Sequence, residues 1–153
     1  MGEAAIRRAT AADVPAIVGL LADDVLGAQR ERPGDPAYAK AFEAIAADPH
    51  QWLMVADADG EVVGTLQLTL IPGLSHRGTT RAQVEAVRVS ASRRGSGLGT
   101  RMLEWAVGTA RDLGCGVVQL TSNASRADAH RFYERLGFEA SHTGFKLALR
   151  PPR

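Results

Sequence analysis

Cysteine, lysine and long apolar runs are all scarce in this chain of 153 residues. Cys115 is the single cysteine, which excludes an internal disulfide and the paired CxxC spacing of a zinc site. No apolar run approaches the roughly 20 residues of a membrane-spanning helix. The first residues, with Glu3, Arg7 and Arg8, lack the apolar core of a signal peptide. From these absences we expect a protein of the reducing cytoplasm with no membrane partner.

A strong charge of either sign is absent too. The 18 Lys and Arg residues oppose 17 Asp and Glu residues, which leaves a net charge of +1. Such a balance gives no field that would favour nucleic acid, so we expect no nucleic-acid partner. Hydrophobic residues make up 45% of the chain, which is ordinary for a soluble globular protein. The length fits a single domain over residues 1–153.

Helical and strand patterns alternate along the chain. Thr10 and Asp13 form a helix-capping signal, and apolar residues at helical spacing follow them. Residues 57–60 have the composition of a hairpin turn, and residues 71–80 read as an exposed loop. Strands are expected at 5–9, 52–56, 62–70, 84–89, 117–120 and 145–149, and helices after residue 13, after residue 35, over 97–113 and over 127–136. The order β-α-α-β-β-β-α-β-α-β predicts one α/β domain with a mixed sheet.

The most informative segment is glycine-rich and joins a strand to a helix. Gly95, Gly97 and Gly99 would let the backbone approach a ligand closely, and the N–H groups of the helix start favour a phosphate. Arg93, Arg94 and Arg101 add positive charge. The pattern predicts a pyrophosphate site, the alternative being a turn that only reverses the chain. It lacks the lysine of a P-loop. It also lacks the acid of a dinucleotide fold, because the next strand ends in Thr121–Ser122–Asn123.

Two motifs carry a resemblance to a known family. Arg94, Gly97 and Gly99 match the acetyl-CoA motif [QR]-x-x-G-x-[GA] of the GNAT N-acetyltransferases. Residues 130–138, HRFYERLGF, resemble a second signature of that family, in the family's order and spacing. The segment from Leu120 to Tyr133, followed by Ser141–His142, is similar to aminoalkylphosphonate N-acetyltransferases.

The resemblance implies an α/β (α+β) GNAT fold with a mixed, mostly antiparallel sheet of six to seven strands and about four helices. It implies acetyl-CoA as cosubstrate. Many family members have an asparagine seven positions before the motif tyrosine, where this chain has Arg126. By resemblance, the cofactor-binding residues are Val87, Arg88, Val89, Arg94, Gly95, Ser96, Gly97, Leu98, Gly99, Thr100, Asn123, Arg126 and Tyr133.

Transfer to an amine requires proton removal, since an alkylamine of pKa near ~10 is only about one part in a thousand neutral at pH 7. Glu85, within an apolar strand, is the candidate base, and burial would raise its pKa. Its alternatives are a solvated strand residue or an ion-pair partner of Arg88. Tyr133 matches the family tyrosine that protonates the thiolate, the alternative being a core aromatic. Direct transfer leaves Cys115 without a catalytic role.

No motif in the sequence identifies the acceptor. Arg77, Arg81, Ser122 and His142 are candidate substrate-binding residues. The arginines would hold a carboxylate or phosphonate, the alternative being solvated surface arginines. Histidines 76, 130 and 142 are alternative bases, and no metal site is expected.

We expect a primary amine of a small molecule as acceptor: an aminoalkylphosphonate, amino acid, polyamine or antibiotic-like amine. The alternatives are a protein N-terminal or lysine acetyltransferase, and a non-catalytic acetyl-CoA-binding sensor module. An exposed loop near residues 71–74 suggests a homodimer.

Overall fold

The computed structural model describes residues 2–150. They divide into two compact units, the first ending at Leu120 and the second beginning at Thr121. The single domain over residues 1–153 therefore stays a prediction. Among the described helices, none is long and apolar enough to cross a membrane.

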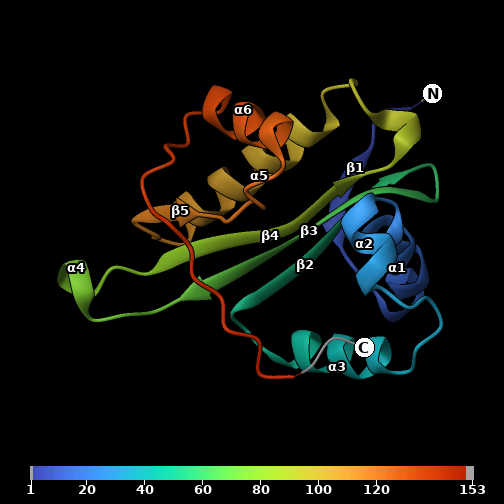
Figure 1. Cartoon of the computed structure of the whole chain (residues 1–153), viewed down its shortest axis with the longest axis horizontal. Coiled ribbons are helices and arrows are strands. Elements are labelled where there is room, and N and C mark those ends of the chain that lie inside the picture. Colours follow the sequence, from blue (N-terminus) through green and yellow to red (C-terminus); the bar gives the residue numbers. More distant parts are fainter. Residues whose placement is uncertain (1, 151–153) are drawn as a thin grey trace. The chain divides into compact units, whose positions relative to one another are not determined.

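The first unit is built on one sheet in the order β1-β2-β3-β4-β5 (Figure 1). Neighbours are antiparallel except for β5, which runs parallel to β4. The mixed, mostly antiparallel sheet is thus confirmed. Its strands are β1 Ala5–Arg8, β2 Gln51–Ala58, β3 Glu61–Ile71, β4 Arg81–Val89 and β5 Val117–Gln119.

The expected count of six to seven strands is wrong for the described residues, which contain five. The missing strand is the one expected at 145–149. Its alternating side chains Phe145, Leu147 and Leu149 are 91%, 86% and 91% exposed. Alternation predicts a strand only where a neighbouring strand satisfies the backbone, and none pairs with these residues in the described part of the chain. The short strand expected at 117–120 is found as β5, and its Val117 is 45% exposed.

The described residues contain six α-helices, where about four were expected. One expected helix is divided in two, because Asp24 caps a new helix by accepting the backbone N–H of Gly27. Another is a single turn inside the expected loop at 71–80, where His76 and Arg77 have left-handed φ values of 53° and 62°. The helices are α1 Val14–Ala22, α2 Val25–Arg30, α3 Ala37–Ala47, α4 Ser75–Gly78, α5 Leu98–Asp112 and, in the second unit, α6 Ala127–Arg135.

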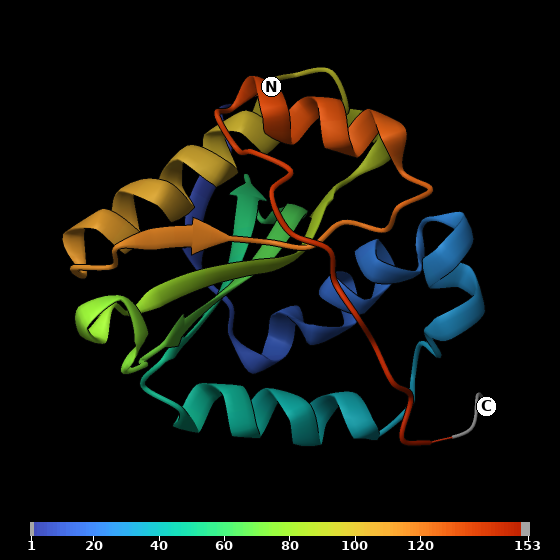
Figure 2. The ribbon, with the colours of Figure 1, turned by 60° about the vertical axis from the view of Figure 1, so that its left-hand side comes forward.

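Helices cover both faces of the sheet in the first unit. α5 lies on one face and α1 and α3 lie on the other (Figures 1 and 2). The α5 side contains fully buried Leu66, Leu68, Met102 and Leu103. A Cβ on Gly64 would come within 2.8 Å of Met102 Sδ, so glycine permits the helix to pack close to β3.

Two local structures predicted from the sequence, a hairpin turn and a helix cap, are present in the first unit. The hairpin turn between β2 and β3 is confirmed, with φ of 52° at Asp59 and 91° at Gly60. The capping pair is confirmed as well, because Thr10 N–H donates to Asp13 Oδ2 at 2.7 Å. Arg7 donates two further bonds to Asp13, at 2.8 and 3.0 Å. These bonds from Arg7 lower the pKa of Asp13 to about 2.

Candidate functional site

A β-bulge interrupts β4 at the predicted site. Gln67 pairs with Glu85 and Thr65 pairs with Arg88, so β4 contains one residue more than β3 between these two pairs. Ala86 lies in the bulge with φ of 55°, a left-handed value that residues other than glycine rarely adopt. The extra residue brings Glu85 and Arg88 to the same face of the sheet, where strict alternation would separate them.

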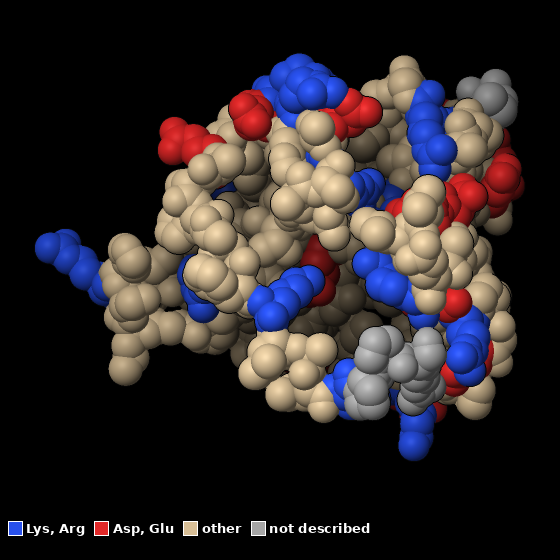
Figure 3. Space-filling model, viewed as in Figure 1, with Lys and Arg blue, Asp and Glu red and all other residues tan. Residues whose placement is uncertain are grey.

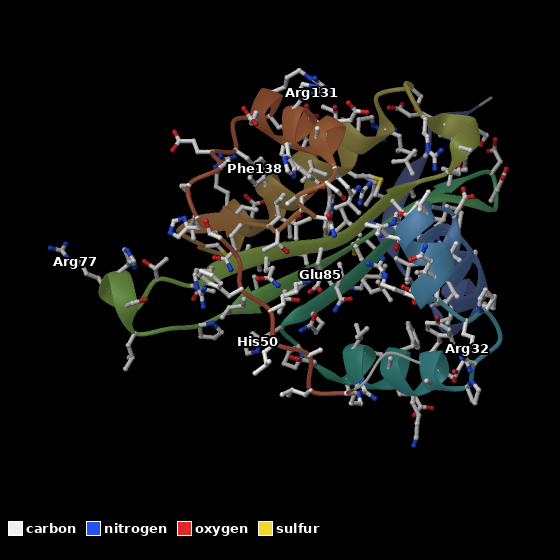
Figure 4. The ribbon with its side chains drawn as sticks, viewed as in Figure 1. Arg32, His50, Arg77, Glu85, Arg131 and Phe138 are labelled. Carbon is white, nitrogen blue, oxygen red and sulfur yellow. The ribbon has the colours of Figure 1, made fainter. Side chains whose placement is uncertain are left out.

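Glu85 lies on that face, near the middle of β4 (Figure 4). Its side chain is exposed, so the burial expected for the candidate base is not found. Arg88 is held elsewhere: its Nε lies 3.3 Å from Asp24 Oδ2 and its Nη1 donates to Val87 O at 2.9 Å. The Arg88 ion pair thus ties the bulged strand to the start of α2.

β4 and β5 separate beyond a short paired stretch. Their register covers only Arg81–Gln83 against Val117–Gln119, so in the described part of the first unit no strand pairs with this edge of β4 beyond Gln83. Ser90 N–H donates to Val63 O on the β3 side at 2.8 Å. Because backbone groups alternate sides along a strand, the N–H groups of Val89 and Val87 point to the open edge. An extended amide-bearing ligand arm fits beside such an edge.

The glycine-rich loop has the backbone geometry of an anion cradle. Gly95 and Gly97 are left-handed, with φ of 77° and 86°, and Gly97 is the N-cap of α5. Buried Leu98 anchors the helix start. The N–H groups of Gly99 and Thr100 belong to the first turn of α5, whose N–H groups have no intrahelical acceptor. A phosphate group therefore fits the residues present here.

The arginines of this loop differ in what they contact. Arg94 is exposed, and its Nη2 lies 3.7 Å from Asp23 Oδ2 on the α1–α2 turn. Acidic and basic side chains lie side by side at this end of the first unit (Figure 3). Arg101 points elsewhere, since its Nη2 donates to Ala4 O at 2.8 Å and its Nε lies 3.4 Å from Glu3. Arg94 is thus the better placed cation for a pyrophosphate.

The second unit holds the remaining predicted cofactor residues. Tyr133 on α6 is half-buried and packs edge-on against Phe132 and Phe138, at centroid distances of 5.2 and 5.9 Å. Asn123 Oδ1 caps the following turn by accepting Ser125 N–H at 3.0 Å. Arg126 borders an open pocket of about 380 Å³ at the start of α6, lined by residues 125–129.

The candidate acceptor residues belong to different segments of the two units. Arg81 lies on the same face of β4 as Glu85 and is half-buried. Arg77 points away from the sheet at the tip of the β3–β4 hairpin, so the structure does not bring it to Glu85 (Figure 4). In the second unit, Ser122 lies in the segment before α6, and His142 Nδ1 lies 2.7 Å from Ser141 Oγ.

The other titratable candidates are accounted for by their surroundings. His130 Nε2 lies 2.9 Å from Asn123 O. Burial raises the pKa of the Cys115 thiol, which suits a structural cysteine. Within residues 2–150, no group of three or more His, Cys, Asp or Glu side chains converges.

A polar row on the sheet was not singled out from the sequence. Glutamines 51, 67, 83 and 119, together with Thr69 and Arg81, lie on the Glu85 face of four neighbouring strands. The sequence signal for it is polar residues two apart within a strand, as in Gln67–Thr69 and Gln83–Glu85, because such residues lie on the same face. Only the strand register shows that they form one row.

Known proteins resemble the chain over most of its length. The sequence model of the Acetyltransferase (GNAT) family matches residues 19–138. The aminoalkylphosphonate N-acetyltransferase of Salmonella typhimurium is 31% identical, over 94% of this chain and 90% of that protein. The L-methionine sulfoximine/L-methionine sulfone acetyltransferase of Pseudomonas paraeruginosa is 34% identical, over 90% of this chain and 81% of that protein.

Solved structures agree with this fold. A crystal structure from Bacillus halodurans, described as a transcriptional regulator, is 44% identical with a TM-score of 0.92. The match covers 95% of this chain and 99% of that one.

Proposed function

As the chain belongs to the GNAT acetyltransferase family, it is an acetyl-CoA-dependent N-acetyltransferase, and we propose that its acceptor is a small primary amine bearing a tetrahedral, oxygen-rich phosphorus or sulfur group. One observation carries the proposal. The two curated relatives are named for phosphonate and for sulfoximine or sulfone acceptors, and both share more than 30% of their aligned residues with this chain. Arg81 on the Glu85 face supports it, because a guanidinium suits such oxygens.

The proposed cofactor site combines three parts of the chain. Arg94 and the backbone of residues 95–100 hold the pyrophosphate, as the left-handed glycines and the helix start allow. The open edge of β4 at Val87 and Val89 binds the amide-bearing arm. Arg88 keeps this edge in place through its ion pair with Asp24. Asn123, Arg126 and Tyr133 of the second unit are proposed as cofactor residues on their resemblance to the family's motifs alone.

The proposed chemistry assigns one proton to each of two residues. Glu85 takes a proton from the acceptor ammonium, directly or through water, because the neutral amine is disfavoured by roughly 4 kcal/mol at pH 7. The amine nitrogen then bonds to the acetyl carbon as the bond from that carbon to the CoA sulfur breaks. The Tyr133 hydroxyl donates a proton to the departing thiolate.

Single substitutions test these assignments. Glu85→Gln and Tyr133→Phe should each lower kcat about a hundredfold, the usual loss for a general base or acid, while acetyl-CoA still binds. Glu104→Gln, on the exposed side of α5, is the matched control and should retain full turnover. Unchanged kcat in both site variants would show that the assignments are wrong.

An acceptor panel separates this proposal from its alternatives. CoA release and product mass should be scored with 2-aminoethylphosphonate, methionine sulfone, spermidine, an aminoglycoside, and peptides with a free N-terminus or lysine. Phosphonate and sulfone acceptors should give the highest kcat/KM. Acetylation of peptides alone would establish a protein acetyltransferase. The Bacillus halodurans description favours a sensor as second candidate, which acetyl-CoA binding without turnover of any amine would support.

We also propose that the protein works in the cytoplasm as a homodimer. The support is the lone cysteine and Leu74, which is 96% exposed beside α4. The solution mass, measured by light scattering, should be twice that of the 16.2 kDa chain, and Leu74→Ser should reduce it to that of a monomer. A monomeric wild-type protein would contradict this proposal.

A further inference from the structure

Side-chain hydrogen bonds order the polar row defined above in two groups. On the β2–β3 side, Gln67 Nε2 and Thr69 Oγ1 both donate to Gln51 Oε1, each at 2.8 Å. On the β4–β5 side, Arg81 Nη1 donates to Gln119 Oε1 at 3.4 Å, and Gln119 Nε2 donates to Gln83 Oε1 at 3.0 Å. All six residues are half-buried. The row is therefore an ordered feature of the sheet face, unlike a set of free surface side chains.

These hydrogen bonds engage most of the carboxamide oxygens of the row and leave several of its N–H groups as donors for a ligand. The carbonyl oxygens of Gln51, Gln83 and Gln119 each accept a bond within the row. The amide NH₂ groups of Gln51 and Gln83 retain donors, as does the guanidinium of Arg81, which has five N–H groups. Among the six residues, Gln67 Oε1 is the carboxamide oxygen that accepts no bond from the others. A ligand that matches this balance brings hydrogen-bond acceptors, and a negative charge to meet Arg81.

We infer that this row, with Gln83 and Arg81 at its centre, binds the oxygen-rich acidic end of the acceptor and sets its specificity. The inference rests on the proposed function and names the residues that select the substrate class. Phosphonate, sulfone and carboxylate oxygens all present acceptors for the donors that the row retains. A plain alkylamine or a polyamine offers none.

The register places this row next to the candidate base. Gln83 and Glu85 are two residues apart on the same face of β4, before the bulge, which separates their Cα atoms by about 7 Å. An amine at Glu85 and an acidic group at Gln83 and Arg81 are thus bridged by a short aliphatic linker. Glu85 itself would repel an acidic group, which fixes the orientation of the acceptor along the strand.

Conservative variants test the row. Gln83→Met removes the amide donors and keeps the side-chain length, and Arg81→Met removes the guanidinium and keeps an unbranched apolar stem. For 2-aminoethylphosphonate, each should raise KM about tenfold or more, the effect of losing a hydrogen bond to a charged group, with a smaller change in kcat. For propylamine, which has no acidic group, the KM change should be much smaller. Gln29→Met, the same exchange on exposed α2, is the control and should match the wild type with both acceptors.

Equal losses on both acceptors, or no loss on either, would overturn the inference. A calorimetric titration of 2-aminoethylphosphonate into the CoA-bound protein measures the affinity for the acceptor without turnover. Binding that Arg81→Met weakens about tenfold supports the inference, and equal affinity in the two proteins contradicts it. Failure of the proposed function is distinct: the wild type would then acetylate peptides, or no amine at all, whatever the titration shows. Gln83→Glu provides a second variant, expected to repel the phosphonate more strongly than Gln83→Met.

Discussion

Alanine at Gly97 should destabilise the protein, whereas alanine at Gly108 of the same helix should stabilise it. Gly97 has φ of 86° and ψ of 2°, and a Cβ there would meet no heavy atom within 4 Å. The cost is therefore backbone strain, about 1–2 kcal/mol for a left-handed alanine, offset in part by the lower entropy of the unfolded chain. Gly108 lies inside α5 with equally open space, where alanine gains about 1 kcal/mol.

The same exchange thus changes the free energy of unfolding in opposite directions, with a difference of about 2 kcal/mol between the variants. Urea unfolding at pH 7, followed by circular dichroism, measures both values. A titration with acetyl-CoA adds the functional reading. Gly97→Ala should weaken binding, because it disturbs the N–H groups that face the phosphates, and Gly108→Ala should leave the affinity unchanged.

Equal stabilisation of both variants would refute the left-handed geometry at Gly97. A destabilised Gly97→Ala variant with normal acetyl-CoA affinity would refute the cradle while leaving the geometry intact. The two halves of the prediction therefore fail separately.

Two other predictions concern titrating groups. Asp13→Asn should cost on the order of 2 kcal/mol at pH 7, because a folded pKa of about 2 against 3.8 stabilises the protein above the unfolded value. That advantage is lost as the pH falls from about 4 to about 2, so urea midpoints of variant and wild type should converge there; a constant difference would contradict it. Cys115→Ser should retain full turnover, and the wild-type thiol should react slowly with Ellman's reagent near neutral pH, because burial raises its pKa. Rapid labelling that abolishes activity would exclude this.

Features fixed by neighbouring residues could be predicted from the sequence. The turn at Asp59–Gly60, the capping pair Thr10–Asp13 and the start of α5 at the glycine loop all depend on residues within a few positions. Their conformations follow from the side chains present, such as glycine at a positive φ. The left-handed glycines of the proposed phosphate site could be predicted for the same reason.

Features fixed by pairing between distant segments could not be predicted from the sequence. The bulge at Ala86 arises because β4 must match β3, and alanine gives no local signal of a positive φ. Phe145 begins an alternating stretch typical of a strand, yet no strand forms there without a partner. The row at Gln67 and Gln83 is likewise visible only after the register of β3 and β4 is known.

Acetyl-CoA binding is best tested by thermal unfolding of the purified protein with acetyl-CoA, CoA, NAD and ATP in parallel. A ligand that binds the native state stabilises it by about 2.7 kcal/mol at a hundredfold excess over Kd. We expect a clear rise in Tm with acetyl-CoA and CoA, and no rise with NAD or ATP. Stabilisation by NAD or ATP alone, or by none of the four, would contradict the assignment of the glycine loop and β4 edge as an acetyl-CoA site.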